Sequence, residues 1–275
     1  MKNTVHTEED YGRIAAWFGL YIDGFRGAGG ALPGPLEFKR RHSGRVAENS
    51  ALIAAGLGLE AEEASLARAA GLLHDAGRFT QFSRYASFRD ADSLDHGLEG
   101  RRVLEQAAAP LFADGRAFGR LLCAVQYHNR KPEDIPPGLP AGEDSLLRLV
   151  RDADKLDIMG ELIASVETDG FRGLQELVPD IKPVRALTPG VLAAAARGET
   201  LSLKDLVTLG DILVMVAGWF HDLNYGPARK LAAERGFLAG LRRQLPESAE
   251  LAAFFSAVAG AAERPWREYE LKAVL

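Results

Sequence analysis

The sequence predicts an all-α protein, and three observations support this. Apolar residues recur at helical spacing through most of the 275 residues. The sequence shows no convincing run of alternating apolar and polar residues, the pattern expected of half-buried strands. Stretches rich in glycine and proline, such as residues 27–35 and 131–142, separate the periodic segments. We therefore expect helices that pack on helices around a common core.

The segment before residue 38 is expected to hold one helix and a connector. Thr7 is a suitable N-cap, and the three acidic residues after it favour the positive end of a helix dipole. Apolar and aromatic residues then recur at helical spacing as far as Phe25. The connector at residues 27–35 follows.

Two further helices are predicted over residues 38–57 and 61–75. In the first, His42 lies one turn before Val46 on the apolar face. The second ends in His74 and Asp75, and the next glycine, Gly77, is expected to stop it. An imidazole and a carboxylate at the buried end of a helix are costly unless both are satisfied, and a divalent metal would satisfy them.

The next segments bring further polar residues to buried positions. Residues 80–95 have no clear period and are expected to form a long loop. Asp95 is a plausible N-cap for a helix that begins at His96. A helix over residues 116–128 carries an apolar stripe that His128 continues. Asp154 interrupts the apolar stripe of a helix that starts at Ser145. Irregular chain is expected at 168–190, and further helices at 190–197, 203–221, 227–244 and 247–262.

Composition narrows the class of protein. A net charge of −5 gives no reason to expect nucleic acid or an anionic membrane as partner. The single cysteine, Cys123, cannot form an internal disulfide, which fits a reducing compartment. The N-terminus lacks the apolar core of a signal peptide, and the longest apolar run, Ile212 to Phe220, is shorter than the ~20 residues that span a bilayer. We expect a cytoplasmic protein that binds neither nucleic acid nor membrane; its oligomeric state is left open.

Six polar residues fall on faces that should be buried, and they come from five helices. This set exceeds the needs of one tetrahedral metal and suits two ions that share a carboxylate. Mixed imidazole and carboxylate ligation favours two divalent transition metal ions, with Fe, Mn, Co, Ni and Zn as candidates. The six residues are His42, His74, Asp75, His96, His128 and Asp154.

The order of these residues resembles the HD-domain metal-dependent phosphohydrolase superfamily. The resemblance covers about residues 38–160 and rests first on the segments 41–46, 71–78 and 151–157. Two more segments, 95–100 and 127–129, are similar to the extra histidine segments of the binuclear branch, which includes HD-GYP proteins. The Gly-Tyr-Pro signature is absent from the corresponding stretches, so a cyclic dinucleotide substrate is poorly supported. The resemblance implies an HD-domain helical bundle at residues 38–165, preceded by residues 1–37 and followed by a C-terminal α-helical extension at 166–275.

The resemblance also implies a role for each ligand. Asp75 would bridge the two metals. His42, His74 and Asp154 would complete the site of one ion, while His96 and His128 would hold the other.

The implied reaction is hydrolysis of a phosphate ester in a small molecule or nucleotide, by a phosphomonoesterase or phosphodiesterase. Two cations lower the pKa of a shared water and make hydroxide available near neutral pH. Arg78 stands where many HD-GYP relatives have a phosphate-contacting lysine, and Lys155 and Arg45 could also bind phosphate oxygens. A surface ion pair is the alternative for Arg78 and Lys155.

Two other functions share this ligand set. One is an HD-type di-iron oxygenase, and the other is a non-catalytic helical module with a structural metal. A second His-Asp pair, His221 and Asp222, has no companion histidine after His128, so we expect it to be structural. His6 is expected to be exposed to solvent.

Overall fold

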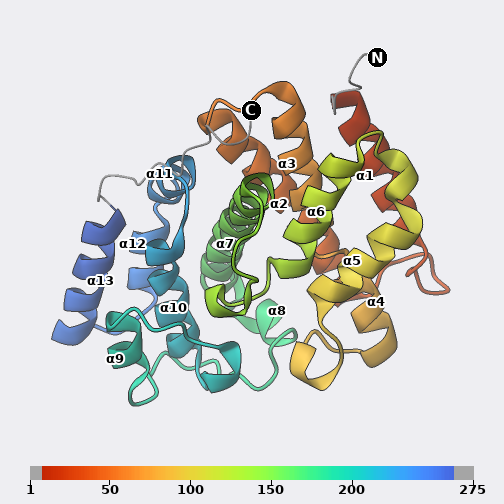
Figure 1. Cartoon of the computed structure of the whole chain (residues 1–275). Coiled ribbons are helices and arrows are strands. Elements are labelled where there is room, and N and C mark those ends of the chain that lie inside the picture. Colours follow the sequence, from red (N-terminus) through yellow and green to blue (C-terminus); the bar gives the residue numbers. More distant parts are fainter. Residues whose placement is uncertain (1–7, 263–275) are drawn as a thin grey trace. The chain divides into compact units, whose positions relative to one another are not determined.

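The protein is all-α, as predicted. The computed structural model describes residues 8–262 (Figure 1), so His6 and Thr7 lie outside the described part. Within that part there is no strand, and a single isolated bridge pairs Lys182 with Thr208. The α-helices are α1 (Glu8–Asp23), α2 (Gly34–Gly56), α3 (Ala61–Leu73), α4 (Ala76–Tyr85), α5 (His96–Ala107), α6 (Gly115–Tyr127), α7 (Ala141–Asp169), α8 (Arg172–Gln175), α9 (Val191–Ala196), α10 (Leu209–Gly218), α11 (Gly226–Glu234), α12 (Phe237–Arg243) and α13 (Ala249–Ala262). The short 3-10 helices are η1 (Asp90–Asp92), η2 (Ala109–Leu111), η3 (Pro132–Asp134), η4 (Leu203–Asp205) and η5 (Trp219–Asp222).

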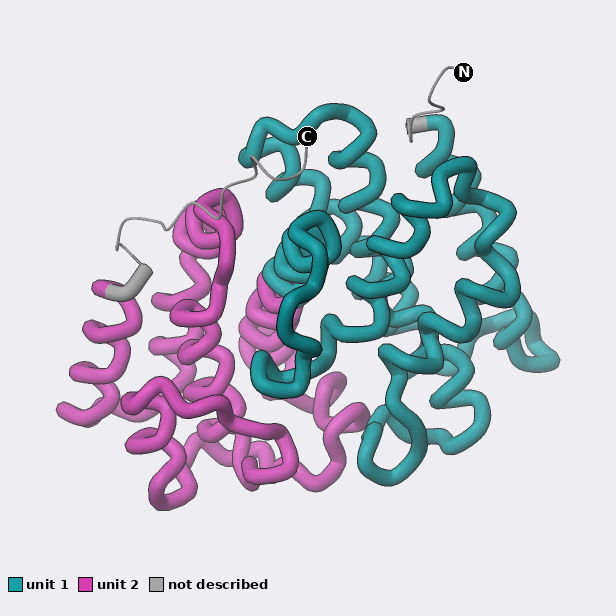
Figure 2. Tube along the Cα trace, in the orientation of Figure 1, with its two compact units in different colours: residues 1–154, 268–275 teal, residues 155–267 magenta. Residues whose placement is uncertain are grey.

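The chain divides into two compact units (Figure 2). Among the described residues, unit 1 comprises residues 8–154 and unit 2 comprises residues 155–262. The division falls inside α7, which contributes its first half to unit 1 and its second half to unit 2. The predicted domain limits after residues 37 and 165 stay predictions, because the two units are defined by compactness rather than by motif.

Unit 1 is built on the close pairing of α2 and α3. A side chain at Gly71 would place its Cβ 2.3 Å from Ser50 Oγ and 2.9 Å from the Val46 carbonyl oxygen, so this approach requires glycine. Val46 and Ile53 are fully buried on α2, as the apolar stripe predicts. Because His74 follows Gly71 by about one turn, this packing brings it next to α2.

The expected loop at residues 80–95 begins later than predicted, because residues 80–85 belong to α4. The chain turns after His74 and Asp75 and enters α4, and η1 follows within the same stretch. Gly77 does not stop a helix but lies in the first turn of α4, where its ideal Cβ would be 2.1 Å from the His96 carbonyl oxygen and 2.5 Å from the Gly100 nitrogen. The glycine therefore permits α4 to lie against α5, a tertiary role that local periodicity does not reveal.

Helix α5 begins with the cap that the sequence suggests. Asp95 Oδ1 accepts a hydrogen bond from the Leu98 backbone N–H at 3.1 Å, which confirms it as the N-cap of α5. Helix α6 ends at Tyr127, so His128 lies at its C-cap, where it is 6% exposed. His96 is the first residue of α5 and His128 follows the last residue of α6, so both histidines lie at helix ends.

Unit 2 contains more helix breaks than the sequence predicts. The expected helix at 227–244 is two helices, α11 and α12, separated at Gly236, whose φ of +64° favours glycine. The expected helix at 203–221 becomes η4, α10 and η5, and Thr208 forms a capping box with Asp211 at the start of α10. A capping box marks the start of a helix and a left-handed glycine commonly marks an end, and both signals are weak beside a continuous apolar pattern.

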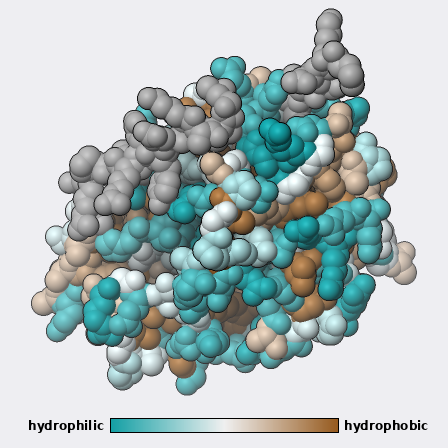
Figure 3. All heavy atoms as spheres, viewed as in Figure 1, coloured by the Kyte–Doolittle hydropathy of each residue, from teal (hydrophilic) through white to brown (hydrophobic). Residues whose placement is uncertain are grey.

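No helix among the described residues is long and apolar enough to cross a membrane. Hydrophilic and apolar residues are interspersed on the face of the molecule shown in Figure 3.

Candidate metal centre

The predicted His-Asp pair lies at the junction of α3 and α4. His74 caps the end of α3 and is fully buried, and Asp75 precedes α4 with 2% exposure. Tyr21 on α1 supports this junction, because its hydroxyl donates to the Ala76 carbonyl oxygen at 2.9 Å and lies 3.0 Å from Thr80 Oγ1. The junction therefore holds an imidazole and a carboxylate inside unit 1.

The first histidine pair joins α2 to this junction. The Nε2 atoms of His42 and His74 are 3.2 Å apart. Asp75 Oδ2 lies 3.5 Å from His42 Nε2 and 3.6 Å from His74 Nε2. Asp154 Oδ1 is 3.2 Å and 3.7 Å from the same two nitrogens. Four of the predicted ligands thus converge on one position.

The second histidine pair joins α5 to the end of α6. The Nε2 atoms of His96 and His128 are 3.1 Å apart. Asp75 Oδ1 lies 3.4 Å from His96 Nε2 and 3.6 Å from His128 Nε2. Each histidine pair therefore faces a different oxygen of one carboxylate, and the two groups of candidate ligands share Asp75.

Hydrogen bonds at the Nδ1 atoms fix the ring orientation of three of these four histidines. His74 Nδ1 lies 2.8 Å from the Gly71 carbonyl oxygen, and His128 Nδ1 lies 2.8 Å from the Val125 carbonyl oxygen. His96 Nδ1 lies 2.6 Å from Asp90 Oδ2. Because each Nδ1 faces an acceptor, it carries the proton, and the lone pair of each Nε2 points into the site.

These residues fit a divalent metal. Nε2 lone pairs that face each other at 3.1 Å repel unless a cation lies between them. Asp154 Oδ1 is buried, and among the described residues no group donates to it with hydrogen-bond geometry. Imidazole nitrogens and carboxylate oxygens, without thiolates, suit transition metals better than calcium.

Burial sets the protonation states that metal binding needs. It lowers the pKa of His74 to about 3 and the pKa of His96 to about 4, so both are neutral near pH 7. Burial alone would raise the pKa of Asp75, but Lys39 and His74 hold it well below its ordinary value. The pKa of Asp154 is also lowered, against the effect of its burial, by His42 and His74. Neutral imidazoles and ionised carboxylates are the forms that bind metals.

The metal-free protein should lose stability as the pH falls from 6.5 toward 4. The unfolded chain protonates His74 and His96 near pH 6.5, whereas the folded chain does so only near pH 3 and 4. Unfolding therefore takes up protons in this window, and each histidine should lower the free energy of unfolding by about 1 kcal/mol per pH unit. The depressed pKa values of Asp75 and Asp154 act in the same direction at lower pH. Denaturant unfolding of chelator-treated protein at pH 6.5 and 4.5 measures this slope.

The control for this slope is His221→Gln, because His221 is exposed and lies in unit 2. This variant should keep the wild-type dependence on pH. A free energy of unfolding that is constant or rises toward pH 4.5 would contradict the burial of neutral imidazoles.

Arg78, the predicted phosphate contact, is held by several acceptors. Its Nη1 donates to the Phe88 carbonyl oxygen at 2.5 Å, to Gln81 Oε1 at 2.8 Å and to Asp90 Oδ1 at 2.9 Å. Its Nε lies 3.6 Å from Asp75 Oδ1. The guanidinium is therefore fixed beside the second histidine pair, and its role toward phosphate stays a prediction.

Asp90 is a site residue that sequence reasoning missed. One oxygen accepts from His96 and from Asn129 Nδ2, and the other accepts from Arg78 and Gln81. His96, Arg78 and Gln81 together lower the pKa of Asp90, although burial alone would raise it. The sequence offers several acidic residues between 90 and 95, and only the position of η1 shows which one orients the imidazole of His96.

Lys39 is the second residue that was missed. Its Nζ lies 2.7 Å from Asp75 Oδ2, the oxygen that faces His42 and His74. Lys39 precedes His42 by three residues on α2, so the two side chains share one face of the helix. That spacing was readable in the sequence, but a lysine near a helix start is common and carries no signal alone.

Lys155, the other predicted catalytic residue, has a carboxylate partner in unit 2. Its Nζ donates to the carbonyl oxygen of Asp222 at 2.9 Å and also binds the Asp222 carboxylate. Asp222 of the second His-Asp pair is thus the partner of Lys155, and both residues of that pair lie in η5. The predicted contact of Lys155 with phosphate stays a prediction. The predicted contact of Arg45 with phosphate likewise stays a prediction.

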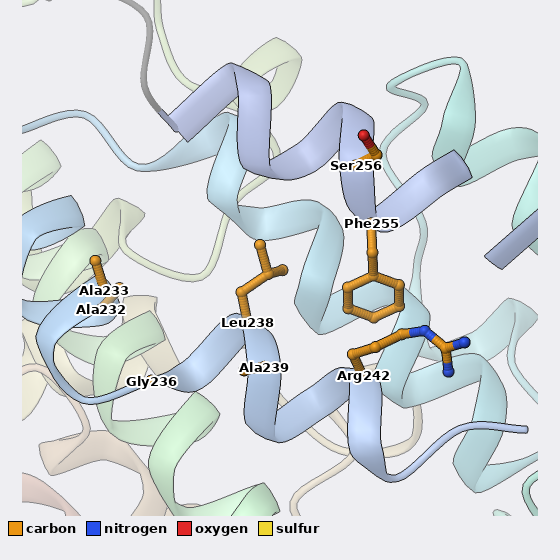
Figure 4. A pocket seen from close by; sticks show the side chains of 8 residues that line it. All are labelled: Ala232, Ala233, Gly236, Leu238, Ala239, Arg242, Phe255 and Ser256. Carbon is orange, nitrogen blue, oxygen red and sulfur yellow. The ribbon is translucent and has the colours of Figure 1, made fainter. Parts of the chain in front are cut away.

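A separate cavity lies in unit 2 among α11, α12 and α13 (Figure 4). Its volume is about 480 Å³, and Leu238 and Phe255 form part of its mostly apolar lining. Arg242 also lines it, but its guanidinium lies over the Phe255 ring and donates to the carbonyl oxygens of Leu245 and Pro246. None of the predicted site residues is among the residues that line this cavity.

Comparison with known protein families gives a match over residues 40–159, to the family described as the HD domain. This range contains all six predicted ligands, and both histidine pairs lie within it. No curated protein and no solved structure matches the chain.

Proposed function

Because residues 40–159 of this chain form an HD domain, a domain of the metal-dependent hydrolase type, we propose that the protein is a phosphohydrolase with a binuclear metal site. The substrate is a phosphate ester of a small molecule or nucleotide. The first histidine pair, Asp75 and Asp154 would hold one metal, and the second pair with Asp75 would hold the other. Iron, manganese, cobalt, nickel and zinc all suit these ligands.

The observation that carries the proposal is the position of Asp75. Its Oδ2 lies within 3.6 Å of both Nε2 atoms of the first pair, and its Oδ1 lies within 3.6 Å of both Nε2 atoms of the second pair. A single-metal HD site needs only the first group. The second pair has no counterpart in a mononuclear site, and it meets the remaining oxygen of the same carboxylate.

The chain's own residues supply the rest of the chemistry. Two divalent ions would lower the pKa of a water molecule and neutralise charge on a phosphoryl group. Asp75 and Asp154 cannot neutralise two such ions, so the site keeps an excess of positive charge that favours a dianionic phosphate. Asp90 orients His96 through Nδ1, and carboxylate partners of this kind make an imidazole a better ligand. Arg78 lies beside Asp75 Oδ1 and adds its positive charge to the region where the phosphoryl group would bind.

Metal analysis and a panel of phosphate esters test this proposal. Protein purified without chelator should contain two metals per chain and should release phosphate from at least one ester. Removal of the metal should abolish the release, and one of the five candidate metals should restore it. One tightly held metal without hydrolysis would indicate a structural site. Oxygen consumption by an iron-loaded protein, without phosphate release, would indicate the oxygenase alternative.

A further inference from the structure

Each oxygen of Asp75 is approached by one cationic side chain as well as by one histidine pair. Lys39 Nζ lies 2.7 Å from Oδ2, and Arg78 Nε lies 3.6 Å from Oδ1. The ring of Phe88 lies near both cations, with its centroid 5.8 Å from Lys39 Nζ and 5.7 Å from Arg78 Cζ. Two positive groups and one aromatic ring therefore border the candidate metal centre.

The two cations differ in how firmly they are held. Arg78 Nη1 has three acceptors, one each from Phe88, Gln81 and Asp90. Lys39 donates a hydrogen bond to Asp75 and, within the described part of the chain, to no other group. Its side chain is 15% exposed. A lysine ammonium on a four-carbon stem can change partners, whereas the guanidinium of Arg78 is fixed by its surroundings.

Lys39 and a metal need the same atom. Oδ2 is the oxygen of Asp75 that faces His42 and His74, and it is also the oxygen that Lys39 binds. A divalent ion held by His42, His74 and Asp75 would partly neutralise the negative charge of Oδ2. The attraction between Oδ2 and the Lys39 ammonium would then be weaker. An anion beside the metal would then be the stronger partner for Lys39.

We propose that Lys39 exchanges Asp75 for an oxygen of the substrate's phosphoryl group when the site holds metal, and so acts as a specificity residue for phosphate. This proposal rests on the function proposed above. It assigns the mobile phosphate contact to α2, one turn before His42, rather than to Arg78. Phe88, which is partly exposed and packs on Phe82 with ring centroids 5.1 Å apart, forms an apolar side of the same region.

The test separates metal binding from phosphate binding in the full chain. Calorimetry with Mn²⁺ on chelator-treated protein measures the affinity for metal. Calorimetry with inorganic phosphate on the Mn²⁺-loaded protein measures the affinity for the anion. The variants are Lys39→Met, which removes the charge at nearly equal length, and Lys39→Gln, which keeps a hydrogen-bond donor in case the methionine variant fails to fold. The control is Lys230→Met, because Lys230 is 76% exposed and pairs with Glu234 one helical turn away.

Both Lys39 variants should bind Mn²⁺ at least as tightly as the wild type, because a competing cation has been removed. Both should bind phosphate about 10-fold or more weakly, the effect of losing one charge-assisted hydrogen bond. Lys230→Met should match the wild type in both measurements. Unchanged phosphate affinity in the Lys39 variants would overturn the proposal, and so would a loss of metal affinity that accounts for the weaker phosphate binding. A wild-type protein that binds neither Mn²⁺ nor any of the other four candidate metals would instead overturn the binuclear site itself.

Discussion

Asp75→Asn should abolish metal-dependent hydrolysis, with a loss of more than about 100-fold, and should release at least one metal. The amide offers one oxygen and one nitrogen that carries protons, so it cannot face both histidine pairs with acceptor atoms. It also removes the negative charge that Lys39 and Arg78 approach. Metal analysis and phosphate release, measured beside circular dichroism to check folding, give the result.

The matched control is Asp222→Asn in the second His-Asp pair. Asp222 binds Lys155 within unit 2, so its loss should lower stability but leave metal content and turnover close to those of the wild type. Equal loss of metal in the two variants would place the metal site elsewhere than at Asp75.

His96→Ala and His128→Ala should each remove one metal and leave the other bound. Both histidines face Asp75 Oδ1, while His42, His74 and Asp154 remain as ligands on the other side. Hydrolysis should fall by about 100-fold or more, since the second ion contributes to water activation and to charge neutralisation. The measurement is metal stoichiometry beside phosphate release for both variants.

Folding should survive these two substitutions, because the first group still joins α2, the α3–α4 junction and α7. His221→Ala, at an exposed position, is the control and should retain both metals. Two metals retained in His96→Ala and in His128→Ala would show that these histidines are structural. The site at Asp75 would then bind a single metal ion, and the other metal would lie elsewhere.

Several features could be predicted from the sequence because their causes are local. Apolar spacing of 3.6 residues predicted α2, α3, α6 and α7. Asp95 was recognisable as an N-cap, since capping involves only the backbone of the next turn. The six candidate ligands were recognisable as well, because a polar residue on an apolar helical face is unusual wherever the helix packs.

The tertiary structure alone decided how these residues meet. Gly77 carries the sequence signal of a helix end, yet the structure uses it for the approach of α4 to α5, a contact between segments that are far apart in the chain. Asp90 and Lys39 resemble ordinary surface residues in the sequence, and their roles follow from partners 6 and 36 residues away. Lys155 was expected near phosphate, and its partner is 67 residues further on.

The sequence by itself therefore determined the helical class and the chemical identity of the candidate ligands. Helical periodicity, and polar residues that interrupt an apolar face, can both be recognised within one short segment of the sequence. The tertiary structure decided which oxygen of Asp75 each histidine pair faces and which cation lies beside it. Apart from those of the near neighbours His74 and Arg78, these assignments depend on distances of 2.7 to 3.6 Å between Asp75 and side chains of α2, α5 and the end of α6, and such distances are set by packing rather than by spacing along the chain.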